Sequence, residues 1–230
     1  MRKVLILTPV GDGRVDVRYV DSLVRTLRAA PEGVGVDFLF IAHDALVQRA
    51  RNDLLVAAMN PELDDVVFID ADEAWAPKWF YDLLEHKVDV VGLPVVKKSD
   101  VEQYNVKCVS FKPEIRPDGL MQVDGVGAGF LRLTRKALKY VWDNTPKYVE
   151  NGIEKRMAFN VSVVDEELVG EDISFCKILA PLGVYIDARY TIPHIGHKVY
   201  AGKFDTWLSR VTGAQGLPAQ PTAAGTAKGG

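Results

Sequence analysis

Two carboxylates separated by one residue are the first groups in this sequence with the type and spacing for chemistry. The apolar residues 66–69 are followed at once by Asp70, Ala71 and Asp72. Alternate residues of an extended segment point the same way, so both carboxylates can converge on one cation. Mg²⁺ and Mn²⁺ accept oxygen ligands and often bridge substrate phosphates. The alternative is that Asp70 or Asp72 caps a helix that begins near Pro77.

The elements that must position these acids alternate in the first half of the chain. Apolar runs rich in branched residues predict strands over 3–8, 34–41, 65–69 and 88–95. Apolar residues at helical spacing predict helices over 17–30 and 45–59, and Pro77 opens a third. This order predicts an α/β fold with a mostly parallel central sheet and helices on both faces. Ligands of such sheets gather at the carboxyl ends of the strands, where Asp70 and Asp72 lie.

The second half is less regular, and the composition describes one globular domain. Further strands are predicted over 106–111, 129–133 and 184–187, and helices over 135–142 and 171–182. From about residue 213 to residue 230 a Gly-, Ala-, Pro- and Thr-rich stretch without periodicity predicts a disordered tail. The chain has 230 residues, of which 48% are hydrophobic and 26% charged, and this suits a single core.

The compartment is predicted from what the sequence lacks. No apolar run approaches the roughly 18–20 residues that a membrane span needs, so no membrane partner is expected. The apolar run after Met1 stops at Pro9, which suits a core strand better than a signal peptide. Cys108 and Cys176 have neither metal-site nor disulfide spacing, which predicts a reduced, cytoplasmic protein.

Four motifs, in this order, resemble those of GT-A glycosyltransferases, particularly small family-2-like members of phage or bacterial type. Residues 70–72 (DAD) resemble the DxD signature, and residues 126–131 (VGAGFL) resemble the "VGTGF" stretch. Residues 170–176 (GEDISFC) resemble the "ED" motif that opens a helix, and residues 190–196 (YTIPHIG) resemble the late "HxG" segment. The resemblance covers roughly residues 4 to 200. It implies a Rossmann-like GT-A domain over 1–212, with a nucleotide-sugar-binding half to about residue 96 and an acceptor and catalytic half from about residue 97.

The resemblance also implies a nucleotide-sugar donor, expected to be a UDP-sugar, and a Mn²⁺ or Mg²⁺ cofactor. The departing diphosphate is an anion, so a divalent cation must neutralise charge that grows in the transition state. Asp72 would bind the metal, and Asp70 would touch the ribose or share the metal. His194 would be the third protein ligand, with His197 as its competitor.

A carboxylate is also needed to take the proton of the acceptor hydroxyl. The resemblance gives this role to Asp172, with Glu171 as the alternative, and direct displacement with a single base would invert the anomeric carbon. Either acid could instead only stabilise the N-terminus of its helix.

The remaining donor-binding candidates follow from their places along the chain. Arg51 can pair with the donor diphosphate, since guanidinium matches phosphate oxygens, or it can be a solvated helix residue. Thr8 and Pro9 end the first strand and are expected near the nucleotide base, and Ala71 lies between the two acids. Gly127 and Gly129 would let the backbone approach the substrate closely, or they only form a tight turn.

Two other functions and the acceptor stay open. A nucleotidyltransferase would need a Gly-rich, basic phosphate loop after the first strand, and residues 11–14 (GDGR) are too short and acidic for one. A non-catalytic nucleotide-sugar-binding module would have no use for Asp172. Residues 97–156 hold twelve Lys and Arg against eight Asp and Glu, an excess that suits an anionic acceptor such as a flipped hydroxymethylated pyrimidine in DNA. Protein, glycan and small-molecule acceptors stay open, as does the oligomeric state.

Overall fold

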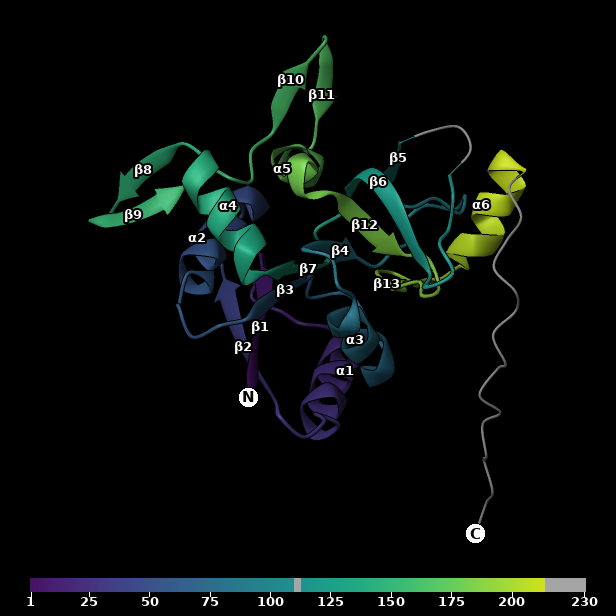
Figure 1. Ribbon diagram of the computed structural model, residues 1–230, viewed down its shortest axis with the longest axis horizontal. Coiled ribbons are helices and arrows are strands. Elements are labelled where there is room, and N and C mark those ends of the chain that lie inside the picture. Colours follow the sequence, from purple (N-terminus) through teal and green to yellow (C-terminus); the bar gives the residue numbers. More distant parts are fainter. Residues whose placement is uncertain (110–112, 214–230) are drawn as a thin grey trace.

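A computed structural model of the chain describes residues 1–109 and 113–213 (Figure 1). Eight strands form the central sheet in the order β2-β1-β3-β7-β4-β12-β6-β5. They are β1 (Arg2–Val10), β2 (Val34–Ala42), β3 (Asp65–Ile69), β4 (Val90–Gly92), β5 (Val106–Cys108), β6 (Leu120–Val126), β7 (Phe130–Thr134) and β12 (Val184–Asp187). The α-helices of the described residues are α1 (Val17–Arg28), α2 (Val47–Ala58), α3 (Pro77–Glu85), α4 (Arg135–Asn144), α5 (Glu171–Leu179) and α6 (Phe204–Thr212). A 3-10 turn, η1 (Ala180–Leu182), follows α5.

The sheet is mostly parallel, as predicted. β1 pairs in parallel with β2 and β3, and β4 pairs in parallel with β12. β7 is antiparallel to both β3 and β4, and β6 is antiparallel to both β12 and β5. All strands of this sheet except β6 and β7 therefore run in the same direction.

The insertion of β7 between β3 and β4 was not predicted. The guanidinium of Arg132, on β7, is buried and donates to Asp65 of β3 over 2.7 Å and to the carbonyl of Val88, before β4, over 2.9 Å. The ion pair joins β7 to β3, and the hydrogen bond joins β7 to the segment that precedes β4. Consecutive strands of a mixed sheet need not be adjacent. The order of elements along the chain therefore does not predict where β7 lies in the sheet.

The predicted helices on both faces are confirmed by how the core divides. In β3 the side chains alternate, so Val66 and Phe68 belong to one buried cluster and Val67 and Ile69 to the other. The first cluster includes the apolar faces of α2, α4 and α5, and the second includes those of α1 and α3. β3 is thus buried on both faces, and the acids that follow it emerge at the edge of the sheet.

Short elements of the second half escaped prediction, among them β6, α6 and three two-stranded sheets. These sheets pair β8 (Lys147–Glu150) with β9 (Ile153–Arg156), β10 (Ser162–Val164) with β11 (Glu167–Val169), and β13 (His194–Ile195) with β14 (Val199–Tyr200). The first two project from the domain (Figure 1). Asn151 and Gly152, both with positive φ, form the β8–β9 turn, and an Asn-Gly pair is a hairpin signal that could have been used.

Two predictions fall wholly or partly outside the described residues. These are the tail, from residue 214 onward, and the strand predicted over 106–111, of which β5 covers the first three residues. Within the described ranges, no helix combines the length and the apolar character that crossing a membrane requires.

Candidate functional site

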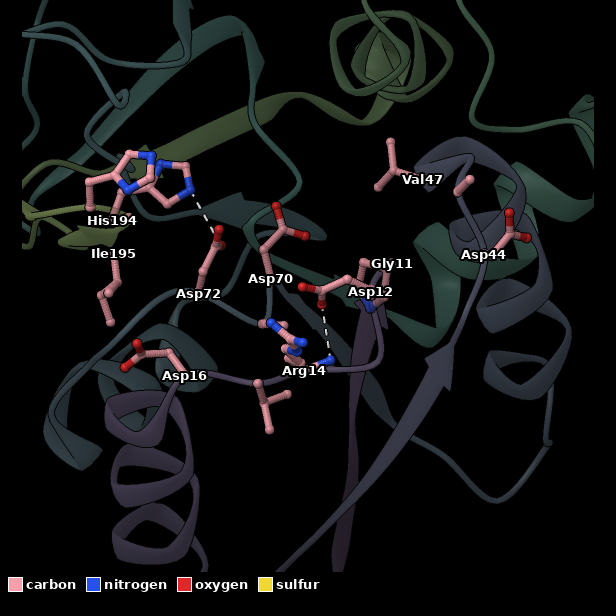
Figure 2. Close-up of a pocket in the computed structure, with 16 residues that line it drawn as sticks. Gly11, Asp12, Arg14, Asp16, Asp44, Val47, Asp70, Asp72, His194 and Ile195 are labelled. Atoms are coloured by element: carbon pink, nitrogen blue, oxygen red, sulfur yellow. Dashed lines mark hydrogen bonds and ion pairs between the residues drawn. The ribbon is translucent and has the colours of Figure 1, made fainter.

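A cleft of about 830 Å³ opens at the carboxyl ends of β1 and β3 (Figure 2). Its walls come from the loop after β1, the segment after β3, the segment leading into α2, and the turn that contains β13. Asp72 and His194 lie on one side of the cleft, and Asp44 and Val47 lie on the other. The cleft is therefore at the sheet edge where open α/β sheets bind their ligands.

The cleft is acidic, yet several of its acids have structural partners. Five aspartates and one arginine line it: Asp12, Asp16, Asp44, Asp70, Asp72 and Arg14. Asp16 caps α1 by accepting from the Arg18 amide over 2.8 Å, and Asp44 pairs with Arg49 over 2.7 Å. An anionic ligand would meet net negative charge here, so its binding would be favoured by a cation.

Asp72 has two basic partners on the rim of the cleft. Lys98 donates to its Oδ2 atom, and Nε2 of His194 lies 3.3 Å from its Oδ1 atom. Burial alone would raise the pKa of Asp72, but the hydrogen bonds from His194 and Lys98 lower it to about 2. The side chain is 39% exposed, so its partners can be exchanged for a ligand without unfolding the core.

His194 is oriented in the way that suits a metal ligand. Its Nδ1 atom lies 3.0 Å from the carbonyl oxygen of Val96, which can only accept, so Nδ1 carries the hydrogen. Nε2 donates to Asp72 when it also carries a hydrogen, and without that hydrogen it presents a lone pair that a cation beside Asp72 can bind. Ligand histidines commonly donate their other N–H to a backbone carbonyl in this manner.

Asp70 is held by a buried arginine. Nη2 of Arg51 lies 2.8 and 3.0 Å from the two carboxylate oxygens of Asp70, and Nη1 lies 2.8 Å from Oε1 of Glu171. Burial alone would lower the pKa of Arg51, but the charges of Asp70 and Glu171 raise it. The interpretation of Arg51 as a solvated helix residue is wrong, since its side chain is 4% exposed. Its contact with a donor diphosphate stays a prediction.

A smaller pocket of about 390 Å³ adjoins the cleft, and Asp70 and His194 line both cavities. Asp172, in the first turn of α5, also lines it and accepts from Nδ2 of Asn105 over 2.5 Å. Burial and then the neighbouring charge of Glu171 raise the pKa of Asp172 above its ordinary value. Nothing in the sequence pattern marked Asn105, because a single asparagine in a loop carries no signal.

Glu73 is a second residue of this pocket that sequence reasoning missed. It is 1% exposed, and its Oε2 atom has no hydrogen-bond partner among the described residues. Burial and then the charges of Asp70 and Asp72 raise the pKa of Glu73 well above its ordinary range. It directly follows the two acids of the motif, so a third acid within four residues was a signal that could have been read.

The other predicted residues take different places. Pro9, Ala71 and His197 line the cleft, whereas Thr8 is fully buried and its hydroxyl is hydrogen-bonded to Tyr19 over 2.6 Å. Gly127 and Gly129 line the smaller pocket, where they make room for the side chains of Asn105 and Glu73.

The donor set fits a hard cation in part. Asp72 and His194 face each other across 3.3 Å, while Asp70 is directed at Arg51. Among the residues that the structure describes, no three Asp, Glu, His or Cys side chains form a ready-made metal cluster. Mg²⁺ and Mn²⁺ commonly take only one or two protein carboxylates and complete their shell with water and substrate phosphate, so Asp72 and His194 suffice for such a site.

Comparison with known proteins gives the fold. No protein-family model matches the sequence, and no curated protein matches it. The crystal structure of A197 from STIV is 18% identical, covers 85% of this chain and 86% of its own, and superposes with a TM-score of 0.54. A glycosyltransferase involved in the glycosylation of the major capsid of PBCV-1 is 11% identical over 61% of this chain and 65% of its own, with a TM-score of 0.35. TarS 1–349 of S. aureus is 14% identical over 84% of this chain and 59% of its own, with a TM-score of 0.36. The first likeness shows a shared fold, and the other two are too weak to support an inference.

Proposed function

We propose that this protein is a glycosyltransferase that moves a sugar from a nucleotide-sugar, expected to be a UDP-sugar, to an acceptor hydroxyl. The observation that carries the proposal is the pair of adjoining cavities that share Asp70 and His194. The wide one suits a nucleotide, and the smaller one contains a half-buried carboxylate, Asp172, whose pKa is raised. The DxD-like motif supplies Asp70, which lines both cavities, and the ED-like motif supplies Asp172 in the smaller pocket.

The residues of the rim hold the donor diphosphate in this proposal. Asp72 and Nε2 of His194 would bind a Mn²⁺ or Mg²⁺ ion, with Lys98 released from Asp72 toward the phosphates. When bound, the ion neutralises charge that develops on the departing diphosphate. Arg51 keeps Asp70 fixed beside the ribose and, by the same guanidinium, keeps Glu171 beside Asp172.

Asp172 acts as the general base. Its carboxylate accepts the proton of the acceptor hydroxyl while the hydroxyl oxygen forms a bond to the anomeric carbon and the bond to the diphosphate breaks. Asn105 and the Ile173 amide each hold one carboxylate oxygen, over 2.5 and 2.9 Å, and so fix the orientation of Asp172. Direct displacement of this kind inverts the anomeric carbon.

A panel of nucleotide-sugars tests the proposal, with transfer and hydrolysis products identified by mass spectrometry. Sugar release or transfer is expected with one nucleotide class, to vanish in excess chelator and to return with Mn²⁺ or Mg²⁺. Binding of a nucleotide-sugar without turnover under every condition would show a binding module, and release of pyrophosphate from a nucleoside triphosphate would show a nucleotidyltransferase.

The same assay tests hydroxymethylated DNA as the acceptor, with a neutral glycan for comparison. Eight of the basic residues between 97 and 156 form ion pairs: Lys98, Arg116, Arg132, Lys136, Lys139, Lys147, Lys155 and Arg156. Within the described ranges, Lys97 and Lys107 are exposed and form no ion pair. If DNA is the acceptor, reversing the charge of both should raise its KM and flatten the dependence of binding on salt. Transfer that does not depend on salt, or no binding to DNA at low salt, would exclude this acceptor.

A further inference from the structure

The smaller pocket contains a polar atom that no group of the described residues satisfies. Within residues 1–109 and 113–213, Oε2 of Glu73 is buried and has no hydrogen-bond partner, and Glu73 lines the pocket beside Asp172. A buried carboxyl oxygen without a partner costs free energy, because it has lost water and gained nothing in exchange. A ligand in the pocket can supply the missing partner.

The backbone is fitted to keep Glu73 in this place. A Cβ atom on residue 129 would lie 2.2 Å from Oε1 of Glu73 and 3.1 Å from Oδ2 of Asp70, so only glycine leaves room for both carboxyl groups. The amide of Asp70 also donates to the Gly129 carbonyl over 2.9 Å, which fixes the distance between the two segments. Glycine at position 129 therefore makes room for Glu73 beside Asp70 on the wall of the pocket.

The charges of the pocket restrict the group that can approach. Asp70, Glu73 and Asp172 contribute three carboxyl groups and outnumber the lysines, since Lys98 is already paired with Asp72 and only Lys97 among the described lining residues is a lysine without an ion pair. A carboxylate on a ligand placed among these acids would be repelled, whereas a hydroxyl on the ligand can donate to an acceptor oxygen. Both protonation states of a carboxyl group can bind a hydroxyl, since the ionised form accepts and the neutral form also donates.

We propose that Glu73 is a specificity-determining residue that binds a hydroxyl of the transferred sugar, so that the smaller pocket accepts a neutral sugar and rejects one that carries a carboxylate. This inference rests on the proposed function, and it assigns the smaller pocket to the sugar and the wide cleft to the nucleotide. Glu73 is not a ligand of the cation in this assignment.

Dissociation constants in the presence of Mn²⁺ test the inference. The probes are a nucleoside diphosphate, its glucose conjugate and its glucuronic acid conjugate, with the nucleotide that the donor panel selects. The wild-type protein should bind the glucose conjugate at least about 10-fold more tightly than the glucuronic acid conjugate. Glu73→Ala should weaken binding of the glucose conjugate by about 10- to 100-fold and leave the nucleoside diphosphate unchanged. Glu73→Gln still offers a donor and an acceptor, so it should retain the glucose conjugate and its preference over the glucuronic acid conjugate, because Asp70 and Asp172 remain in the pocket.

Matched controls separate this role from a structural one. Glu85→Gln removes an exposed carboxylate at the end of α3 and should change none of these constants. Equal affinities of wild type and both Glu73 variants for the two conjugates would overturn the inference while leaving the proposed function in place. A loss of Mn²⁺ affinity without nucleotide in Glu73→Gln would also overturn it, since Glu73 would then belong to the cation site. If no nucleotide-sugar binds at all, the proposed function fails and the inference fails with it.

Discussion

The wide cleft and the smaller pocket adjoin, but they are built from different kinds of side chain. In the cleft, Asp16 and Asp44 are engaged by a helix cap and a surface arginine, and Asp72 is 39% exposed. In the smaller pocket, Glu73 is buried, and burial raises the pKa of both Glu73 and Asp172. Water screens the charge of the exposed Asp72 more than that of the buried Glu73, so substitution of an acid should cost more in the pocket.

The largest effect is expected for Asp172→Asn. This change keeps the shape and removes the base, so kcat should fall by about 10²- to 10⁴-fold while donor affinity stays near wild type. Single-turnover transfer assays and donor titration measure the two quantities. Asp143→Asn, on the exposed face of α4, is the control and should leave both unchanged. Near wild-type turnover in Asp172→Asn would show that the smaller pocket does not contain the general base.

A somewhat smaller loss is expected at the rim. Asp72→Ala should lower kcat by roughly 10²- to 10³-fold, the usual cost of removing one group that stabilises transition-state charge. Its melting temperature should stay near wild type because Asp72 contributes little to the core. Asp12→Asn, in the same cleft, tests whether charge in general is needed. Full activity of Asp72→Ala, or of wild type in excess chelator, would refute the metal assignment.

Gly129→Ala tests how tightly the smaller pocket is packed. The added methyl group would overlap Oε1 of Glu73, so the free energy of unfolding should fall by about 1–3 kcal/mol. Gly35→Ala, whose added Cβ would have ordinary contacts, is the control. The loss should shrink in the background of Glu73→Ala, since the overlapping atom is then gone. Chemical denaturation measures wild type, the three single variants and the double variant, and an unchanged loss in the double variant would place the clash elsewhere.

The smallest expected effect is a shift in the pH dependence of kcat. Activity should fall as the pH drops through the raised pKa of Asp172, because the base becomes protonated. Glu171→Gln removes the neighbouring negative charge that contributes to this shift, so the acid limb of kcat should move to lower pH. At neutral pH turnover should change less than about 10-fold. An inactive Glu171→Gln beside an active Asp172→Asn would assign the base to Glu171.

The strands and helices of the first half could be predicted because each is long enough to show its period, and β3 ends abruptly in acids. Asp70 and Asp72 were found in this way. Lys98, the partner of Asp72, and Asn105, the partner of Asp172, could not be found, since both occur in short, irregular segments without periodicity. Burial decides the chemistry of Glu73, and burial follows from tertiary packing.

The antiparallel strand β7 shows a similar limit. Its own apolar pattern predicted a strand, but its place between β3 and β4 depends on the pairing of Arg132 with Asp65, which are 67 residues apart. The hairpin of β10 and β11 is short, and its turn uses Asp165 and Glu166 at positive φ rather than glycine. Neither feature leaves a local signal.

The buried guanidinium of Arg51 has a consequence for how the candidate site is assembled during folding. It joins Asp70, 19 residues away, to Glu171, 120 residues away, and each carboxylate accepts from a different terminal nitrogen of the guanidinium. Contacts of such long sequence separation form late, because the chain must first close a large loop. A nascent chain that has emerged only to residue 96 would contain every rim residue of β3 and α2, yet it would leave Arg51 without its second carboxylate. The two halves are therefore not exchangeable modules, and catalytic competence should appear in one step when α5 docks.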